Sequence, residues 1–170
     1  MNSIPTLITL VIGDGVTDPL PRQFFFNNKV LTSVTIGAGV PSVGESAFEG
    51  CTALSQVTFG NSITSIGYAA FSGCSKLTSV SLPSSVSPIG SRAFSSCSLL
   101  TSVSLPRGLT AIEDSTFQGC SELSSLSLNS GLMTIGSSAF SSCPKLSTVT
   151  FPDSLSTLGN YAFASCPALT

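Results

Sequence analysis

Apolar residues recur along the chain at every twenty-third position. Phenylalanine takes the same place in each interval from Phe48 to Phe163, and a leucine follows six residues later, from Leu54 to Leu169. Between them lies a cysteine, and this column contains Cys51, Cys74, Cys97, Cys120, Cys143 and Cys166. Self-similarity at a period of about 20 to 50 residues is typical of proteins that stack one short unit on the next. The pattern therefore predicts a repeat array with a continuous apolar core.

Each repeat also predicts its own short elements. Written from the cysteine, the unit reads C-x-x-L-x-x-V-x-L-P-x-x-L-x-x-I-G-x-x-A-F-x-x. The first apolar pair, as in Val103 and Leu105, alternates with polar residues, which is typical of a strand with one buried face. Proline, glycine or asparagine then ends the strand, and the Ile-Gly pair indicates a second short extended segment. The Ala-Phe-x-x-Cys segment is too short for a stable α-helix and predicts a turn or one 3₁₀ turn.

These repeats resemble the BspA-type leucine-rich repeats of bacterial and protist surface proteins. The segment LTSVSLPSSVSPIGSRAFSSC, residues 77–97, carries the resemblance, which extends over residues 31–170. It implies an all-β, right-handed leucine-rich-repeat solenoid of about seven turns, with one short parallel strand per turn. It also implies adhesion, partner binding and a cell-surface or extracellular location. The first repeat fits less well, because Leu7, Leu10, Ile12 and Val16 are one residue out of phase and Asn28 occupies the cysteine column.

The two ends of the array differ in sequence. Residues 1–30, with Pro19, Pro21 and three phenylalanines from Phe24 to Phe26, predict an irregular N-terminal capping repeat. Residues 31–170 predict the array itself, continuous with the cap as one domain. The final CPALT stands where the next strand would begin, without a visible C-terminal cap. Because arrays need polar caps, we expect a fragment, a following domain or an end that packs against another chain.

The cysteine column predicts structure and not chemistry. Successive members lie about 5 Å apart if the strands stack at their usual spacing, and their parallel side chains keep the Cβ atoms as far apart. A disulfide prefers a Cβ separation of about 3.8 Å, so we expect a ladder of buried free thiols. Asn28 in the same column agrees, because asparagine and cysteine can both hydrogen-bond a buried turn. No C-x-x-C pair or histidine completes a metal site, and no cofactor is expected.

Composition excludes several further functions. The absence of histidine removes Ser-His-Asp and Cys-His catalysis, and we expect no enzyme activity. A net charge of −2 with scattered basic residues argues against nucleic-acid binding, and no apolar run is long enough to insert into a membrane. Glu113 and Asp114 predict a solvated turn. Asp14 and Asp18 lack the order of a calcium loop, and the GDG sequence at 13–15 is a repeat turn and not a dinucleotide-binding motif.

Strand alternation predicts one outward face, because the neighbours of inward-pointing residues point outward. These candidate binding residues are almost all hydroxyls: Ser33, Thr35, Gln56, Thr58, Ser79, Ser81, Ser102, Ser104, Ser125, Ser127, Thr148 and Thr150. They predict either cross-strand hydroxyl ladders that solubilise the sheet or a docking surface. Binding hot spots favour Trp, Tyr and Arg, but tryptophan is absent and Tyr68 and Tyr161 fall in the Gly-x-x-Ala turn. Weak multivalent contact, a carbohydrate-like or ordered-water surface, and lateral packing within an assembly all fit better than one tight protein site.

Three functions remain as hypotheses. The first is a non-enzymatic binding or adhesion module that recognises a protein or glycan partner through the solenoid surface. The second is a structural subunit that packs against neighbouring subunits in an assembly or filament. The third is an ice- or water-ordering surface, suggested by the regular T-x-T and S-x-S rows such as Thr148 and Thr150.

Overall fold

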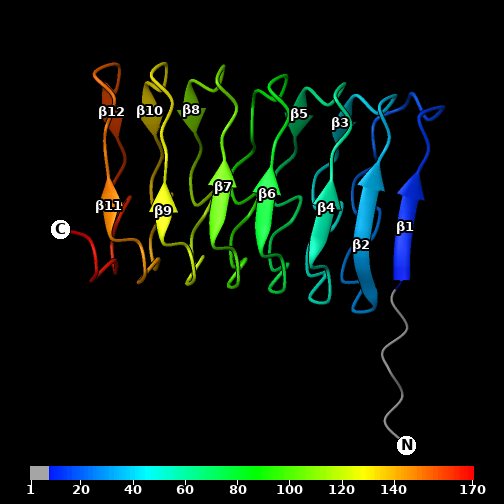
Figure 1. Ribbon diagram of the computed structural model, residues 1–170, viewed down its shortest axis with the longest axis horizontal. Helices are drawn as coiled ribbons and strands as arrows, with labels where there is room; N and C mark the ends of the chain where they lie inside the picture. Colours follow the sequence, from blue (N-terminus) through cyan, green and yellow to red (C-terminus); the bar gives the residue numbers. More distant parts are fainter. Residues whose placement is uncertain (1–7) are drawn as a thin grey trace, which may run out of the picture.

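The computed structural model describes residues 8–170, which form an all-β solenoid of about seven turns. The turns stand side by side along the long axis, with the first described strand at one end and the C-terminus at the other (Figure 1). No helix occurs among the described residues. The predicted parallel repeat solenoid is therefore confirmed, while Leu7 of the first repeat lies outside the described residues.

A first row of parallel strands follows the Val-x-Leu position of each repeat. It contains β1 (Ile8–Ile12), β2 (Leu31–Ile36), β4 (Gln56–Thr58), β6 (Ser79–Ser81), β7 (Ser102–Ser104), β9 (Ser125–Leu126) and β11 (Thr148–Val149). Paired residues hold the same position in successive repeats, as Val80 and Val103 do. The β1–β2 pair starts in that register, with Ile8 opposite Leu31, but after an irregularity Ile12 pairs with Ile36, one position later. This shift confirms that the first repeat is one residue out of phase.

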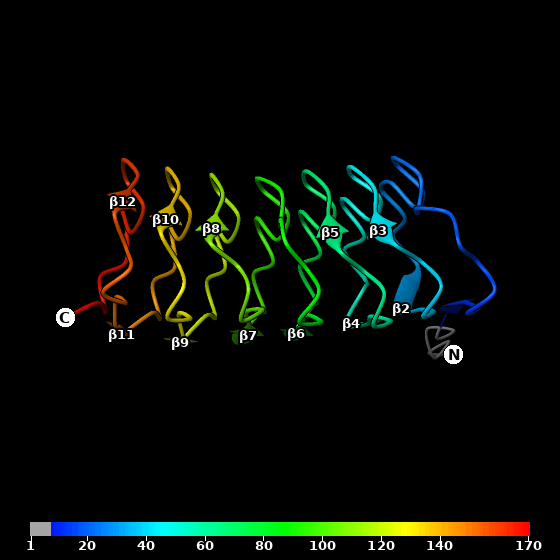
Figure 2. The ribbon, with the colours of Figure 1, turned by 90° about the horizontal axis from the view of Figure 1, so that it is seen from above.

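A second row of strands follows the Ile-Gly position and confirms the second extended segment. It contains β3 (Ser42–Val43), β5 (Ser65–Ile66), β8 (Ala111–Ile112), β10 (Thr134–Ile135) and β12 (Thr157–Leu158). Seen from above, this row runs along the opposite side of the solenoid from β2, β4, β6, β7, β9 and β11 (Figure 2). Apolar columns from both rows point between them and form one buried core.

The phenylalanine column forms the centre of that core. Phe48, Phe71, Phe94, Phe117 and Phe140 are fully buried. From Phe48 to Phe163, successive ring centroids are 5.2–5.6 Å apart and the rings are within 10° of parallel. Separations in this range allow offset stacking, so each turn adds one ring to a continuous aromatic stack.

The Ala-Phe-x-x-Cys turn contains the most regular hydrogen bonding between turns, which we call the Phe ladder. Three main-chain N–H groups of each turn donate to the next turn, and one set runs from Ser46 to Tyr68, from Phe48 to Ala70 and from Gly50 to Ser72. Equivalent sets join every pair of turns from residue 23 to residue 164. Two positions per turn have φ between +50° and +73°, and the first is never glycine. Because of this left-handed backbone, alternate N–H groups point toward the next repeat. The same positive φ angles exclude a 3₁₀ helix in this segment.

Both strand rows are interrupted. Within residues 8–170, strand-ladder bonds are missing between β4 and β6 and between β7 and β9 in the first row, and between the Ile89 position and β8 in the second. The second-row break coincides with Glu113, which stands where other turns have a glycine. A Cβ atom at Gly67 would lie 2.7 Å from the main-chain nitrogen of Glu45 in the preceding turn. Turns at this column therefore approach closely only without a side chain, and Glu113 prevents that approach.

Candidate functional site

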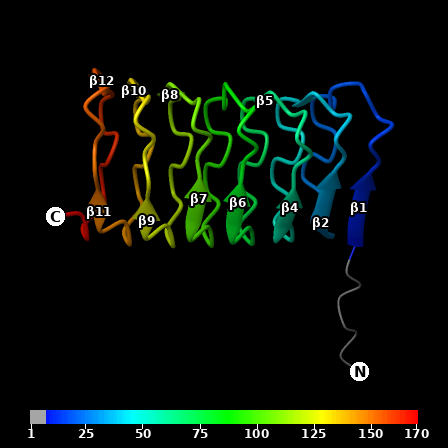
Figure 3. The same ribbon diagram turned by 45° about the horizontal axis from the view of Figure 1, so that its top comes forward.

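The structure places the predicted outward residues along one side of the solenoid, which we call the strand face. Its strands lie side by side along the long axis (Figure 3). Eleven of the twelve residues are exposed, and Ser33 at the N-terminal end is half-buried. The inward neighbours, such as Val80 and Val103, are buried, so the alternation within β6 and β7 is complete. The face carries hydroxyls and one glutamine but no charged or aromatic side chain.

Hydroxyl groups divide into two classes by their hydrogen bonds. Those beside the strands donate to the carbonyl of the preceding turn, as Ser55 does to Thr32 at 3.1 Å and Thr101 to Thr78 at 3.0 Å. Within residues 8–170, the strand face contributes one side-chain hydrogen bond, from Ser33 to Thr9 at 2.8 Å. Cross-strand hydroxyl ladders, one of the two alternatives for this face, are limited to that pair. The remaining hydroxyls have their hydrogen-bonding capacity open to solvent or to a ligand.

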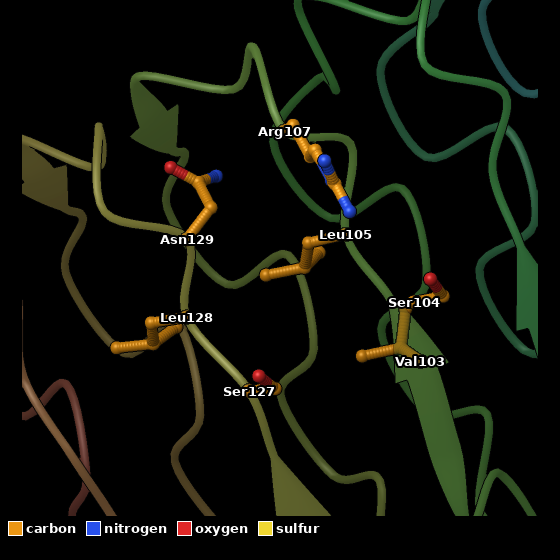
Figure 4. A pocket seen from close by; sticks show the side chains of 7 residues that line it. All are labelled: Val103, Ser104, Leu105, Arg107, Ser127, Leu128 and Asn129. Atoms are coloured by element: carbon orange, nitrogen blue, oxygen red, sulfur yellow. The ribbon is translucent and has the colours of Figure 1, made fainter.

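Two shallow depressions lie next to each other at the end of the strand face. The larger has a volume of about 370 Å³ and lies between the β7 and β9 segments, where the strand ladder is interrupted. Figure 4 shows Arg107 and Asn129 at one end of it, Leu105 and Leu128 across the middle, and Ser104 and Ser127 toward the other end. The second, of about 260 Å³, continues from Ser127 and Leu128 to Thr150 and Phe151.

These depressions were not foreseen from the sequence. Ser104, Ser127 and Thr150 are among the predicted outward residues, whereas the strand alternation does not point to Arg107 or Leu128. The available signal was the column after the strand, which holds Ala38, Asn61, Ser84, Arg107, Ser130 and Asp153. Arg107 is the only cation in that column, but the column alone does not show that the strand ladder beside it is interrupted.

The cysteine column lies in the core and makes contacts between turns. All six are free thiols; five are buried, and Cys166 is half-buried. Each Sγ donates to the carbonyl of a phenylalanine 26 residues earlier at 3.1–3.3 Å, from Cys51 with Phe25 to Cys166 with Phe140. Asn28 in the same column instead accepts the N–H groups of Val30 and Leu31. Both residue types thus bind the backbone, but cysteine joins two turns and Asn28 stabilises its own.

Burial suppresses the reactivity of these thiols. Desolvation raises the pKa of Cys51 to about 11 and that of Cys143 to about 12. It also raises the pKa of Cys74, Cys97 and Cys120, in each case with a smaller contribution from a neighbouring cysteine in the column. Because the thiolate is the nucleophile and the metal ligand, these neutral buried groups are poorly suited to either role near neutral pH. Residues 8–170 contain no cluster of three or more potential metal-binding side chains.

The acidic residues singled out in the sequence act on the backbone. Glu113 and Asp114 are exposed, as predicted for a solvated turn. The Oδ1 atom of Asp114 accepts the N–H of Ser137 at 2.6 Å, and that of Asp14 accepts the N–H of Ala38 at 2.6 Å. Both carboxylates therefore bind the turn that follows their own, a contact that the sequence did not indicate.

In the part of the chain that the structure describes, no helix could cross a membrane.

Comparison with protein families decides the classification. A family model described as BspA type leucine rich repeat region (6 copies) matches residues 20–120 and 54–170. The chain belongs to this BspA-type family. Its repeats form the scaffold described above, and leucine-rich-repeat proteins generally mediate protein interactions. A search of curated proteins finds no match to the chain.

Solved structures of bacterial leucine-rich-repeat proteins share this BspA-type fold. A protein from Bacteroides ovatus has a TM-score of 0.69 and 28% identity over 91% of this chain and 48% of its own. The chain thus spans about half of that protein. The Treponema (T. pallidum) leucine-rich-repeat protein has a TM-score of 0.61 and 24% identity, with coverages of 96% and 78%. A leucine-rich cell surface protein from Faecalibacterium prausnitzii has a TM-score of 0.56 and 20% identity, with the same coverages.

Proposed function

We propose that this BspA-type chain is a non-enzymatic binding module that acts in adhesion through its strand face. The observation that carries the proposal is the row of exposed hydroxyls with free hydrogen-bonding capacity on β4, β6, β7, β9 and β11. Several hydroxyls beside the strands, such as those of Ser55, Thr101 and Ser121, bind the backbone of the preceding turn, whereas the strand-face hydroxyls contribute one side-chain bond, from Ser33 to Thr9, within residues 8–170. A surface that the fold does not use is available to a partner.

The chemistry of the face favours many weak contacts over a single tight one. Tight protein interfaces concentrate their binding energy in buried Trp, Tyr and Arg side chains. Tyr68 and Tyr161 are exposed but lie in the Phe-ladder turn and not on the strand face. Rows of similar hydroxyls spaced by the turn-to-turn distance suit an extended, repetitive partner such as a polysaccharide or an elongated matrix protein, because simultaneous weak contacts raise the overall avidity.

Two substitutions in the middle of the face test the proposal. Ser102→Lys together with Ser125→Lys would place two flexible cations on neighbouring strands without changing the core. Ser96→Lys on the Phe-ladder side is the matched control, because Ser96 is also an exposed serine. Binding to immobilised matrix proteins, polysaccharides and whole cells should change for the double variant and not for the control. Equal binding by all three proteins, or no binding by any of them, would contradict the proposed role.

Self-assembly is a second candidate, and the last turn favours it. Leu158 is 54% exposed, whereas Ile66, Ile112 and Ile135 in the same column are at most 1% exposed. Phe151 and Tyr161 are also exposed on this turn, so its apolar side chains would be covered either by a further repeat or by another chain. Light scattering across a concentration series tests this candidate: a monomer at every concentration would remove it, whereas Leu158→Gln should reduce any association.

A further inference from the structure

The two depressions on the strand face form one shallow trough across β7, β9 and β11. They share Ser127 and Leu128, so the larger opens into the smaller along the direction in which the turns stack. The larger depression has a volume of about 370 Å³, which is near the lower end of the range of about 300 to 1,000 Å³ for small-molecule sites. The larger depression lies where β7 and β9 are not joined by ladder bonds, and the smaller lies beside the paired strands β9 and β11.

Arg107 supplies the charge at one end of the trough. Ion pairs among residues 8–170 join Arg22 to Glu45 and Lys145 to Glu122, and Arg107 takes part in neither. Its guanidinium group is therefore free to accept an anionic partner, and its planar donors match the geometry of a carboxylate. A negative group on a ligand would find a charged partner at this end of the trough.

The wall beside Arg107 is held rigid. Nδ2 of Asn129 donates to the carbonyls of Pro106 at 3.0 Å and Leu109 at 2.9 Å, and Oδ1 accepts the N–H of Gly131. These bonds fix the turn after β9 against the turn that carries Arg107. A polar rim that is ordered before binding loses little conformational entropy when a ligand arrives.

The floor and the opposite wall combine apolar and hydroxyl groups. Leu105 and Leu128 are half-buried, and Phe151 is 44% exposed. The ring of Phe151 packs edge-on against that of Phe163, with the ring centroids 5.7 Å apart. Ser127 and Thr150 line the wall, and the strand-face hydroxyls are free of protein hydrogen bonds except for the Ser33–Thr9 pair in residues 8–170. Sugar rings present an apolar face and a rim of hydroxyls, so they can contact both surfaces at once.

We propose that this trough binds a short acidic oligosaccharide whose sugar units carry carboxylates. One carboxylate pairs with Arg107, a ring lies on Leu128 and Phe151, and the ring hydroxyls hydrogen-bond Ser104, Ser127 and Thr150. An acidic peptide fits less well, because the trough has no deep pocket for a side-chain anchor. The inference rests on the proposed function, since it assigns a ligand class to one end of the strand face.

Nuclear magnetic resonance titration of the whole chain tests the proposal with a galacturonic-acid trisaccharide. The methyl ester of the same trisaccharide has the same rings without the charge, and a glutamate-containing tripeptide represents the competing ligand class. Arg107→Gln removes the guanidinium, and Arg92→Gln makes the same change at an exposed arginine outside the trough. We expect the acid to shift the methyl signals of Leu105 and Leu128, and Arg107→Gln to weaken binding about tenfold. Arg92→Gln should leave the affinity unchanged.

Several results would overturn the assignment. They are equal binding of the methyl ester, equal weakening by Arg92→Gln, binding by the tripeptide alone, and the absence of signal changes at Leu105 and Leu128. None of these results depends on the lysine substitutions at Ser102 and Ser125, which test the strand face as a whole. A chain that binds its partners through that face but ignores the trisaccharide would keep the proposed function and lose the ligand assigned to the trough.

Discussion

The Sγ atom of Cys97 donates a hydrogen bond of 3.2 Å to the main-chain carbonyl of Phe71 in the preceding turn. The same carbonyl accepts the N–H of Cys74, also at 3.2 Å, so both of its lone pairs are engaged. One donor comes from the carbonyl's own turn and the other from the next. The cysteine column therefore couples neighbouring turns, which explains its regularity without any catalytic role.

Replacing one thiol should measure that coupling. Cys97→Ala removes one donor from a buried carbonyl and leaves a small void, so we expect a loss of about 1–2 kcal/mol in the free energy of unfolding. Cys166→Ala should cost less than half as much, because that thiol is only half-buried. Urea denaturation of both variants gives the two values. Both thiols donate a 3.2 Å bond to a phenylalanine carbonyl, so equal losses at the two positions would show that burial does not increase the contribution of the thiol.

Alkaline pH should destabilise the folded chain. Burial raises the pKa of Cys51 to about 11 and that of Cys143 to about 12, whereas an unfolded thiol titrates near a pKa of about 8.5. Between these values the folded state keeps each thiol proton and the unfolded state releases it. The contribution of the buried thiols to the free energy of unfolding is therefore intact below about pH 8.5. Above that pH it declines by about 1.4 kcal/mol per pH unit for each buried thiol.

Denaturation series at several pH values give this slope directly. Cys97→Ser provides the matched control, because its hydroxyl does not titrate and the slope should fall by one thiol's share. Ultraviolet absorbance should show the thiolates appearing together with unfolding. Thiolates that form near pH 8.5 while the chain remains folded would contradict the burial of the column.

A serine at a left-handed backbone position marks a site where glycine should stabilise the folded chain. Ser142 has φ of +61°, and glycine occupies the same column at Gly50, Gly73 and Gly119. Glycine reaches this conformation at little steric cost, although it also gives the unfolded chain more freedom. We expect Ser142→Gly to raise the unfolding free energy by about 0.5 kcal/mol and Gly119→Ser to lower it by about 1 kcal/mol.

Thermal denaturation distinguishes this effect from steric crowding. A Cβ atom at Gly119 would meet its nearest neighbours at 3.6 Å, an ordinary contact, so the loss there reflects the backbone angle. If both substitutions change the stability in the same direction, the backbone angle is not the cause.

Glu113 weakens the second strand row, and Glu113→Gly should repair it. Gly67, Gly90 and Gly136 each donate an N–H to the preceding turn at 2.7–2.8 Å, but among the described residues Glu113 makes no such bond to Ile89. Glycine would let the turns approach, and one recovered hydrogen bond contributes about 1 kcal/mol. Hydrogen exchange at residue 113 should become slower in the variant, while Glu113→Ala, which keeps a Cβ atom, should leave the exchange fast. Slow exchange in the unmodified chain would refute this account.

Regular columns explain why so much of the fold could be predicted. Phe94, Cys97 and Leu100 recur in every consensus turn, so their common burial follows from stacking alone. The one-residue phase of the first repeat was also visible, because Leu10 and Ile12 stand one residue farther from Val34 and Ile36 than the repeat length allows. The hydrogen bonds of the Phe ladder were not predictable, since serine, alanine and arginine give no sign of a left-handed backbone.

The site was predictable only where it follows from alternation. The outward positions from Thr35 to Thr150 are exposed because Val80, Val103 and their equivalents are buried. The larger depression beside Arg107 lies where the strand ladder between β7 and β9 is interrupted, and no residue in either strand differs from the consensus enough to indicate that interruption. A single glutamate at position 113 likewise changes the contact between two turns, which one-dimensional periodicity does not describe.

The hydrogen bonds of the Phe ladder run along the solenoid axis from one turn to the next. Tension applied between the two ends pulls these bonds along their own direction, so every interface between turns carries the same force and the weakest opens first. Each released turn frees one whole repeat of the chain. A segment of that length extends by about 70 Å once the spacing of one turn is subtracted. Under load the molecule is thus a tether that lengthens in equal steps and dissipates work at each one.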